Sequence, residues 1–195
     1  MANELAGRTA LVYGVERPAG RKAAVAIAEA GADVALVTLS EDTPAEFAAN
    51  STANEFWALD RKSIVLTTDG RETTFREAIA DATAELAPIA ILIFHAGAPI
   101  PREALAGLRS DPAIVVIVDG EHVASARALL EWTRSLADAG LRANALVASR
   151  TAADAIGPLL KEHKPPQPLD VKAAAVYLAS DATAAVEGAM LVAEA

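Results

Sequence analysis

Apolar residues in this chain fall into short uninterrupted runs, separated by longer segments in which they recur every three or four residues. Short apolar runs are typical of strands buried on both faces of a parallel sheet, and the three- or four-residue spacing is typical of helices that cover it. The runs predict strands at 9–13, 33–39, 63–68, 89–94, 113–118, 142–147 and 189–192. The spaced segments predict helices at 18–30, 73–86, 122–139 and 169–180, weaker helical character over 41–60 and a helical turn near 103–108.

The alternation of these strands and helices predicts an α/β fold. We expect a parallel sheet of about seven strands in doubly wound order, with helices on both faces. The chain has 195 residues and shows no repeat and no linker, so we expect one domain over residues 1–195. Residues 157–168 are rich in proline and are predicted to form a loop.

The composition limits which partners the protein can have. Apolar residues make up 53% of the chain but aromatic residues only 4%, so the core must consist mainly of Ala, Val, Leu and Ile. The net charge of −9 opposes binding to nucleic acid or to an anionic membrane, because both require a basic surface. The absence of cysteine excludes disulfides, thiol nucleophiles and zinc–thiolate sites. We find no signal peptide and no membrane-spanning run, and expect a cytoplasmic protein.

Three stretches of the sequence carry a family pattern. Gly14 and Gly20 follow the first predicted strand in the sequence Gly-Val-Glu-Arg-Pro-Ala-Gly, and the stretches at 133–145 and 169–192 hold the last helices and strands. Together they resemble the short-chain dehydrogenase/reductase family, whose first strand is followed by a G-x-x-x-G-x-G motif. The similarity extends over nearly the whole chain, and its final stretch is the most specific part. The resemblance implies a single-domain Rossmann-like fold derived from NAD(P)-dependent oxidoreductases.

The positions that the resemblance assigns to the cofactor depart from the family pattern. Pro18 replaces the middle glycine of the motif, and proline has no N–H to offer a phosphate. Glu16 adds negative charge to the same loop, which opposes a pyrophosphate. We therefore expect no cofactor, with NAD(P) as the alternative because the remaining glycines could still cradle a phosphate. The candidate cofactor-binding residues are Gly14, Gly20, Asp69 and Gly97.

The catalytic residues of the family are also missing. Active members use a serine and a Tyr-x-x-x-Lys motif for general acid–base catalysis, whereas alignment places His122 opposite the tyrosine and Ala126 opposite the lysine. The loop that would carry the serine is absent. The segment between Gly97 and the fifth strand is about half the length that the family has. We therefore expect no catalytic residues of the family type.

Four other polar residues follow the fourth and fifth strands, whose carboxyl ends meet in a doubly wound sheet. They are His95, Asp119, Glu121 and His122. These side chains could form an acid–base pair or a metal site. Alternatively, Asp119 makes a turn and Glu121 favours the start of the following helix through the helix dipole. Because nothing in their spacing is specific for a metal, we expect no metal site.

Two segments are candidates for subunit contacts. The helix at 122–139 carries an apolar stripe that is either ordinary core or part of an interface, since the resemblance makes this helix a dimer surface. The last strand is a further candidate, because an edge strand without a partner is a liability. The candidate interface residues are Leu129, Leu130, Trp132, Leu136 and Met190.

These observations lead to three hypotheses about function. The first is a non-catalytic subunit that associates with an active short-chain dehydrogenase in a hetero-oligomer and supports it. The second is an enzyme with altered chemistry, in which His122 is the acid or base and His95 orients it. The third is a module that binds a nucleotide-like ligand. The expected partner is an active dehydrogenase subunit or another copy of this chain.

Overall fold

A computed structural model describes residues 3–40, 42–119, 123–148 and 169–194, and it confirms the predicted α/β fold. The predicted loop at 157–168 lies outside these residues. The longer elements, in chain order, are β1 (Thr9–Tyr13), α1 (Pro18–Glu29), β2 (Asp33–Thr38), α2 (Thr43–Ala58), β3 (Ser63–Thr67), α3 (Glu72–Glu85), β4 (Ile91–Phe94), β5 (Ala113–Val118), α4 (Val123–Asp138), β6 (Ala143–Val147), α6 (Val171–Ala179) and β8 (Met190–Glu194). Shorter elements are the 3₁₀ helices η1 (Arg102–Leu105) and η3 (Asp181–Thr183) and the two-residue strand β7 (Leu169–Asp170).

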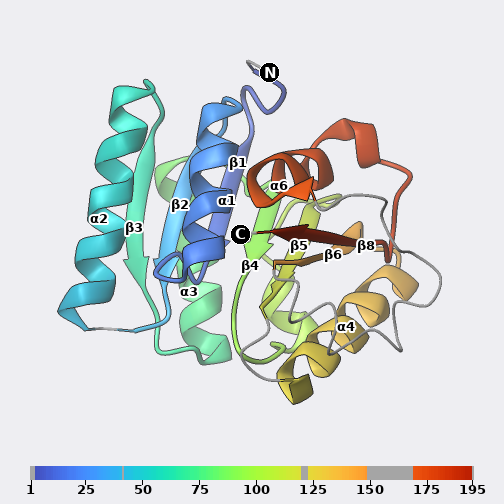
Figure 1. The fold of residues 1–195 in the computed structure, drawn as a ribbon. Coiled ribbons are helices and arrows are strands. Elements are labelled where there is room, and N and C mark those ends of the chain that lie inside the picture. The colour runs from blue at the N-terminus through green and yellow to red at the C-terminus, as the bar shows by residue number, and fades with distance from the viewer. Residues whose placement is uncertain (1–2, 41, 120–122, 149–168, 195) are drawn as a thin grey trace.

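The strands form one parallel sheet in the order β3-β2-β1-β4-β5-β6-β8-β7 (Figure 1). The predicted sheet of about seven strands corresponds to β1–β6 with β8, and β7 adds a short pairing beside β8. The chain moves outward from β1 to β3 in one direction and from β4 to β8 in the other. The direction therefore reverses between β1 and β4, which is the place where ligands bind in doubly wound sheets.

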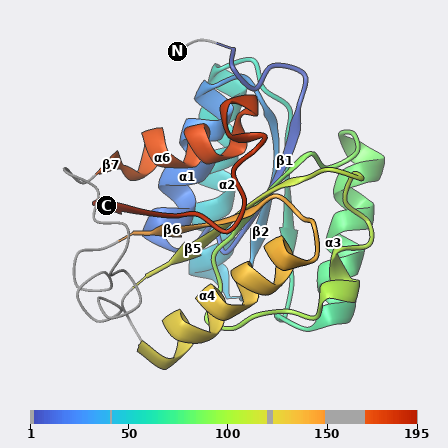
Figure 2. The ribbon, with the colours of Figure 1, turned by 90° about the vertical axis from the view of Figure 1, so that its right-hand side faces the viewer.

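Helices cover both faces of the sheet. Figure 2 shows α1, α2 and α6 on one side and α3 and α4 on the other. Within β1, Ala10 and Val12 belong to the core beneath the first set of helices, while Leu11 and Tyr13 belong to the core beneath the second. Side chains alternate across a strand, so a strand between two helical layers must be apolar at every position.

Helix α2 lies within the range 41–60 and is more regular than its weak apolar pattern predicts. The carboxylate of Asp42 accepts a hydrogen bond from the backbone N–H of Ala45 at 2.8 Å, which caps the start of the helix. The buried positions follow helical spacing and are Ala45, Ala49, Thr52 and Phe56. The inward stripe is narrow and mostly small, which is why the apolar pattern in the sequence is faint.

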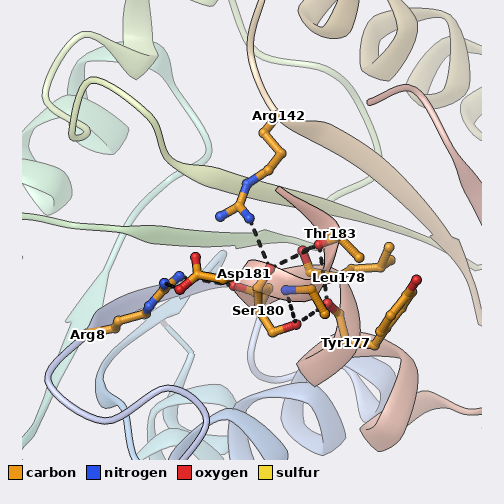
Figure 3. A network of polar contacts seen from close by, with 9 residues as sticks. Arg8, Arg142, Tyr177, Leu178, Ser180, Asp181 and Thr183 are labelled. Atoms are coloured by element: carbon orange, nitrogen blue, oxygen red, sulfur yellow. Dashed lines mark hydrogen bonds and ion pairs between the residues drawn. The ribbon is translucent and has the colours of Figure 1, made fainter. Parts of the chain in front are cut away.

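Two arginines fasten the C-terminal helix to the sheet (Figure 3). Arg142, directly before β6, is 5% exposed and donates from Nη1 to the carbonyl of Ser180 at 2.9 Å. Arg8, directly before β1, donates to the carbonyl of Ala179 and forms an ion pair with Asp181. Positive side chains are favourable at the C-terminus of a helix, where carbonyls lack partners. Helix α6 is thus tied to two strands that lie far apart in the sequence.

The apolar stripe of α4 belongs to the core of this chain. Its predicted interface side chains Leu129, Leu130, Trp132 and Leu136 are between 1% and 9% exposed and pack against the sheet. Met190 is half-buried against the same cluster. Of the two interpretations that the sequence left open for the stripe, burial within one chain favours the core. A partner that met α4 would contact its exposed residues, which include Arg127, Glu131, Arg134 and Asp138.

No helix within the described ranges is long and apolar enough to cross a bilayer.

Candidate functional site

The candidate site lies where the carboxyl ends of β1, β4 and β5 meet. Gly14 follows β1, His95 follows β4 and Asp119 follows β5. The backbone N–H of His95 donates to the carbonyl of Tyr13 at 2.9 Å, which continues the pairing of β1 and β4 past their ends. The structure therefore brings His95 and Asp119 together, as their positions in the sequence predict. The other two candidates of this cluster, Glu121 and His122, lie outside the described residues.

His95 is 1% exposed, and both of its ring nitrogens have partners. Nδ1 accepts a hydrogen bond from the backbone N–H of Gly20 at 3.1 Å, so this nitrogen carries no proton. Nε2 then carries the ring proton and donates it to Oδ2 of Asp119 at 2.7 Å. The imidazole is thereby fixed between the N-terminus of α1 and the end of β5.

Arg17 completes this group, and sequence analysis missed it. Arg17 is the residue before the first turn of α1, and its Nη1 lies 3.3 Å from Oδ2 of Asp119. Its guanidinium also lies close to Gly97, 3.9 Å from where a Cβ on that glycine would stand. Arg17, Asp119 and His95 form one chain of charged and polar contacts across the crevice. The only sequence signal for it was a basic residue inside the glycine motif.

Close packing accounts for the two glycines of the motif. Gly14 has φ +86°, and a Cβ there would stand 1.9 Å from the carbonyl oxygen of His95. A Cβ on Gly20 would stand 2.4 Å from the carbonyl oxygen of Gly14. Real Cβ atoms never approach so closely, so the turn between β1 and α1 requires glycine at both positions whether or not a phosphate binds.

Several N–H groups of the glycine motif already have partners within the protein. Pro18, in the first turn of α1, has no N–H, and the N–H of Gly20 is bonded to His95. Within the same loop, the N–H groups of Val15 and Arg17 donate to backbone carbonyls. Anion binding at a helix N-terminus depends on such groups being available. In this arrangement the loop therefore offers a pyrophosphate fewer donors than a motif with three glycines would.

An acidic side chain also reaches the end of β2, on the side of the crevice where a dinucleotide would place its adenosine. The carboxylate of Glu16 lies 3.4 Å from the backbone N–H of Leu39, directly after β2. In dinucleotide-binding folds an acidic residue at the end of this strand accepts hydrogen bonds from the ribose hydroxyls. Here the acidic group is Glu16, from the loop between β1 and α1, and it accepts from the first backbone N–H after β2.

Asp69, one of the candidate cofactor-binding residues, has its hydrogen-bond partners at the start of α3. Its Oδ1 accepts from the hydroxyl of Thr74 at 2.7 Å and from the backbone N–H of Arg71 at 3.1 Å, and its carboxylate pairs with the Arg71 guanidinium. The hydrogen bonds from Arg71 and Thr74 hold the pKa of this carboxyl well below its usual range. Asp69 thus organises the beginning of a helix.

Tyr13 is buried between aromatic rings near the same crevice. Its ring stacks on Phe94, with centroids 5.2 Å apart, and meets the edge of Phe75 at 4.8 Å. Burial raises the pKa of its hydroxyl, and the hydroxyl of Thr68 donates to it at 3.4 Å. A phenol that is more weakly acidic than usual and enclosed in this way is a core residue.

The described residues do not form a metal-binding cluster. In the part of the chain that the structure describes, no group of three or more His, Asp or Glu side chains converges to hold a metal ion. His95 and Asp119 are two such side chains, and their shared hydrogen bond joins them directly.

No family model matches the chain. In sequence, the chain is 32% identical over 111 residues to general stress protein 39 of Bacillus subtilis (strain 168), a match that covers 56% of this chain and 37% of that protein. The match thus spans little more than a third of the relative's length.

Solved structures are similar over almost the whole chain. The structure of a short-chain dehydrogenase from Mycobacterium paratuberculosis bound to NAD has a TM-score of 0.75 and 19% identity, and 98% of this chain and 97% of that chain are covered. Blue fluorescent protein from a metagenomic library in complex with NADPH has a TM-score of 0.74 and 20% identity, with 98% of each chain covered. A putative short-chain alcohol dehydrogenase from Sinorhizobium meliloti 1021 has a TM-score of 0.72 and 24% identity, with coverages of 97% and 96%. The resemblance seen in the sequence is therefore confirmed in the fold: this chain has the fold of the short-chain dehydrogenases.

Proposed function

We propose that this protein is a non-catalytic subunit that associates with an active short-chain dehydrogenase and supports it. The observation that carries the proposal is the hydrogen bond from the Gly20 N–H to Nδ1 of His95. This contact uses, inside the protein, the helix N-terminus that would otherwise receive a phosphate. A scaffold whose ligand site is filled by its own side chains is suited to a structural role.

Ligand binding at this position would have to displace His95. The His95 ring is buried, and its displacement would break both of its hydrogen bonds. The space that the ring fills in the crevice would then be open. Each neutral hydrogen bond contributes about 0.5–1.5 kcal/mol, and bonds to charged groups contribute more. The carboxylate of Glu16 in the same loop would repel the phosphates, while the charge of Asp119 is paired with that of Arg17.

The hypothesis of altered chemistry receives less support from the geometry. It required His95 to orient His122, but the two ring nitrogens of His95 already bond to Gly20 and Asp119. An imidazole has no third nitrogen with which to hold another side chain. The chemistry of the complex would therefore belong to the partner, as hydride transfer between NAD(P) and a secondary alcohol or ketone.

Native mass spectrometry of the tagged chain, purified from its source cells at low salt, tests the association. We expect the chain to appear in a fixed ratio with a second, dehydrogenase-like chain. Recovery of the chain only as copies of itself would overturn the proposed subunit role.

Calorimetry tests the state of the crevice and decides between the subunit role and a nucleotide-binding module. The module remains the second candidate because two of the similar structures hold NAD and NADPH. We expect no heat of binding when NAD(H) or NADP(H) is added to the wild-type protein. The triple variant E16S/P18G/H95A removes the acidic group, restores an N–H at position 18 and frees the N–H of Gly20, so any regained affinity should appear there first. Binding to the wild-type protein would instead support the module.

A further inference from the structure

Two aromatic side chains stand out on the surface of α2. Trp57 is 84% exposed and Phe47 is 74% exposed, the highest values among the large apolar side chains that the structure describes. Single exposed apolar residues are common, but two on the outer face of one helix suggest a contact surface. Helix α2 lies at the β3 end of the sheet, at the left in Figure 1, away from α4.

The aromatic residues end a stripe along the outward face of α2. The stripe consists of Phe47, Asn50, Asn54 and Trp57, all of which are exposed. At about 100° per residue these four positions fall within an arc of roughly 80°. Their spacing of three, four and three residues is symmetric about residue 52.

We propose that this stripe binds a second copy of the chain through an antiparallel pair of α2 helices. A two-fold axis at the level of residue 52 places Phe47 opposite Trp57 of the second copy and Asn50 opposite its Asn54. An interface of this kind uses the same surface on both subunits and must be self-complementary. The stripe has that property: each aromatic ring meets an aromatic ring, and each amide, which both donates and accepts, meets an amide.

The polarity of α2 suits the antiparallel arrangement. The two helix dipoles oppose each other, so that the positive end of each lies beside the negative end of its neighbour.

The edge strand beside α2 adds some apolar surface. Within the described residues β3 pairs only with β2, and its Val65, which packs with the cluster beneath α2, is partly exposed. An apolar edge strand is usually covered or charged in monomeric proteins. Leu59, just past the end of α2, is 40% exposed.

The available area agrees with a dimer. Each aromatic side chain can bury about 150–250 Å². The four rings of two copies therefore supply roughly half of the 1,200–2,000 Å², in order of magnitude, that a stable interface buries. The asparagines, Leu59 and the neighbouring edge strand are available for the remainder.

Sedimentation equilibrium on the purified full chain tests the association. We expect a concentration-dependent dimer, and we expect Trp57→Ala to raise the dissociation constant roughly thirtyfold or more, as for a central aromatic contact. The matched control is Tyr177→Ala, which removes a 46% exposed aromatic ring on α6 and should leave the dimer unchanged. A wild-type monomer at all concentrations, or equal effects of the two substitutions, would overturn the proposal.

Disulfide trapping tests the register, since the chain has no cysteine of its own. Asn50→Cys and Asn54→Cys are prepared as separate proteins and oxidised alone and as a mixture. The antiparallel register predicts that the mixture forms cross-linked dimers faster than either protein alone. Equal cross-linking in all three samples would refute this register. Because the stripe is remote from the crevice, loss of self-association in Trp57→Ala is distinguishable from loss of a dehydrogenase partner, which mass spectrometry reports separately.

Discussion

Replacing His95 by alanine is the most direct test of the contacts that fill the crevice. The substitution leaves the N–H of Gly20 without its acceptor at a buried position. An unsatisfied buried donor costs about 1–3 kcal/mol. Loss of the contact with Asp119 adds no more than about 1 kcal/mol, because that side chain is 29% exposed and solvent screens the interaction. We therefore expect His95→Ala to lower the free energy of unfolding by about 1–4 kcal/mol.

Urea denaturation followed by circular dichroism measures this loss, and two further variants divide it. In His95→Asn the amide oxygen takes the place of Nδ1 and can accept from Gly20, but the contact with Asp119 is lost. In His95→Gln the amide nitrogen takes the place of Nε2 and can donate to Asp119, but the acceptor for Gly20 is lost. Since the buried donor carries most of the cost, the asparagine variant should be the more stable of the two.

A loss below about 0.5 kcal/mol for His95→Ala would refute this reasoning, because surface substitutions without structural consequence fall in that range. A glutamine variant more stable than the asparagine variant would show that the link to Asp119 outweighs the bond to Gly20. Either result would contradict the importance of the bond between Gly20 and His95, on which the proposed function rests.

Three other predictions, on Gly14, Asp42 and Asp69, concern the stability of the fold. Gly14→Ala should cost about 3 kcal/mol or more, because it adds a clash with the carbonyl of His95 to an unfavourable φ, whereas Gly70→Ala, with φ +79° and no atom nearby, should cost only about 1–2 kcal/mol in the same urea assay. Asp42→Ala should lower stability by about 0.5–2 kcal/mol through loss of the α2 cap, and Asp42→Asn should retain most of it; equal losses would contradict the cap. The lowered pKa of Asp69 means that this carboxylate stabilises the folded state above about pH 4, and that its contribution is lost as the pH falls. Asp69→Asn should thus be less stable than wild type at pH 7, with a difference that narrows below about pH 4 in pH-dependent urea denaturation; a constant difference would contradict the assignment.

The sequence predicted the central strands well, because burial on both faces leaves a clear apolar run. The bounds of β1 and β5 match the predicted 9–13 and 113–118. Helix α2 was harder to predict for a physical reason. Its buried stripe is short and largely alanine, while Phe47 and Trp57 point outward and blur the helical pattern.

The site was predicted only in part. That His95 and Asp119 meet follows from their positions after neighbouring strands, which sequence order reveals. The bond of the His95 ring to Gly20 depends on the approach of β4 to the glycine turn and on the orientation of the imidazole, which no sequence pattern contains. The contact of Arg17 with Asp119 likewise joins residues 102 positions apart.

Under the proposed subunit role, the same contacts explain how a dinucleotide-binding architecture can persist without a ligand. In a protein that binds a cofactor, the bound ligand adds to the stability of the folded state. Here His95 supplies the acceptor for the N-terminus of α1, and Glu16 supplies one for the end of β2, so both are satisfied from within the chain. An entering phosphate would compete with side chains that are already in place. Because these side chains belong to the same chain, their contacts do not carry the entropy cost of bringing two molecules together. In that proposed role, selection acts on the surfaces of the fold, such as the proposed contact stripe on α2, and the crevice contributes by holding β1, β4 and β5 together.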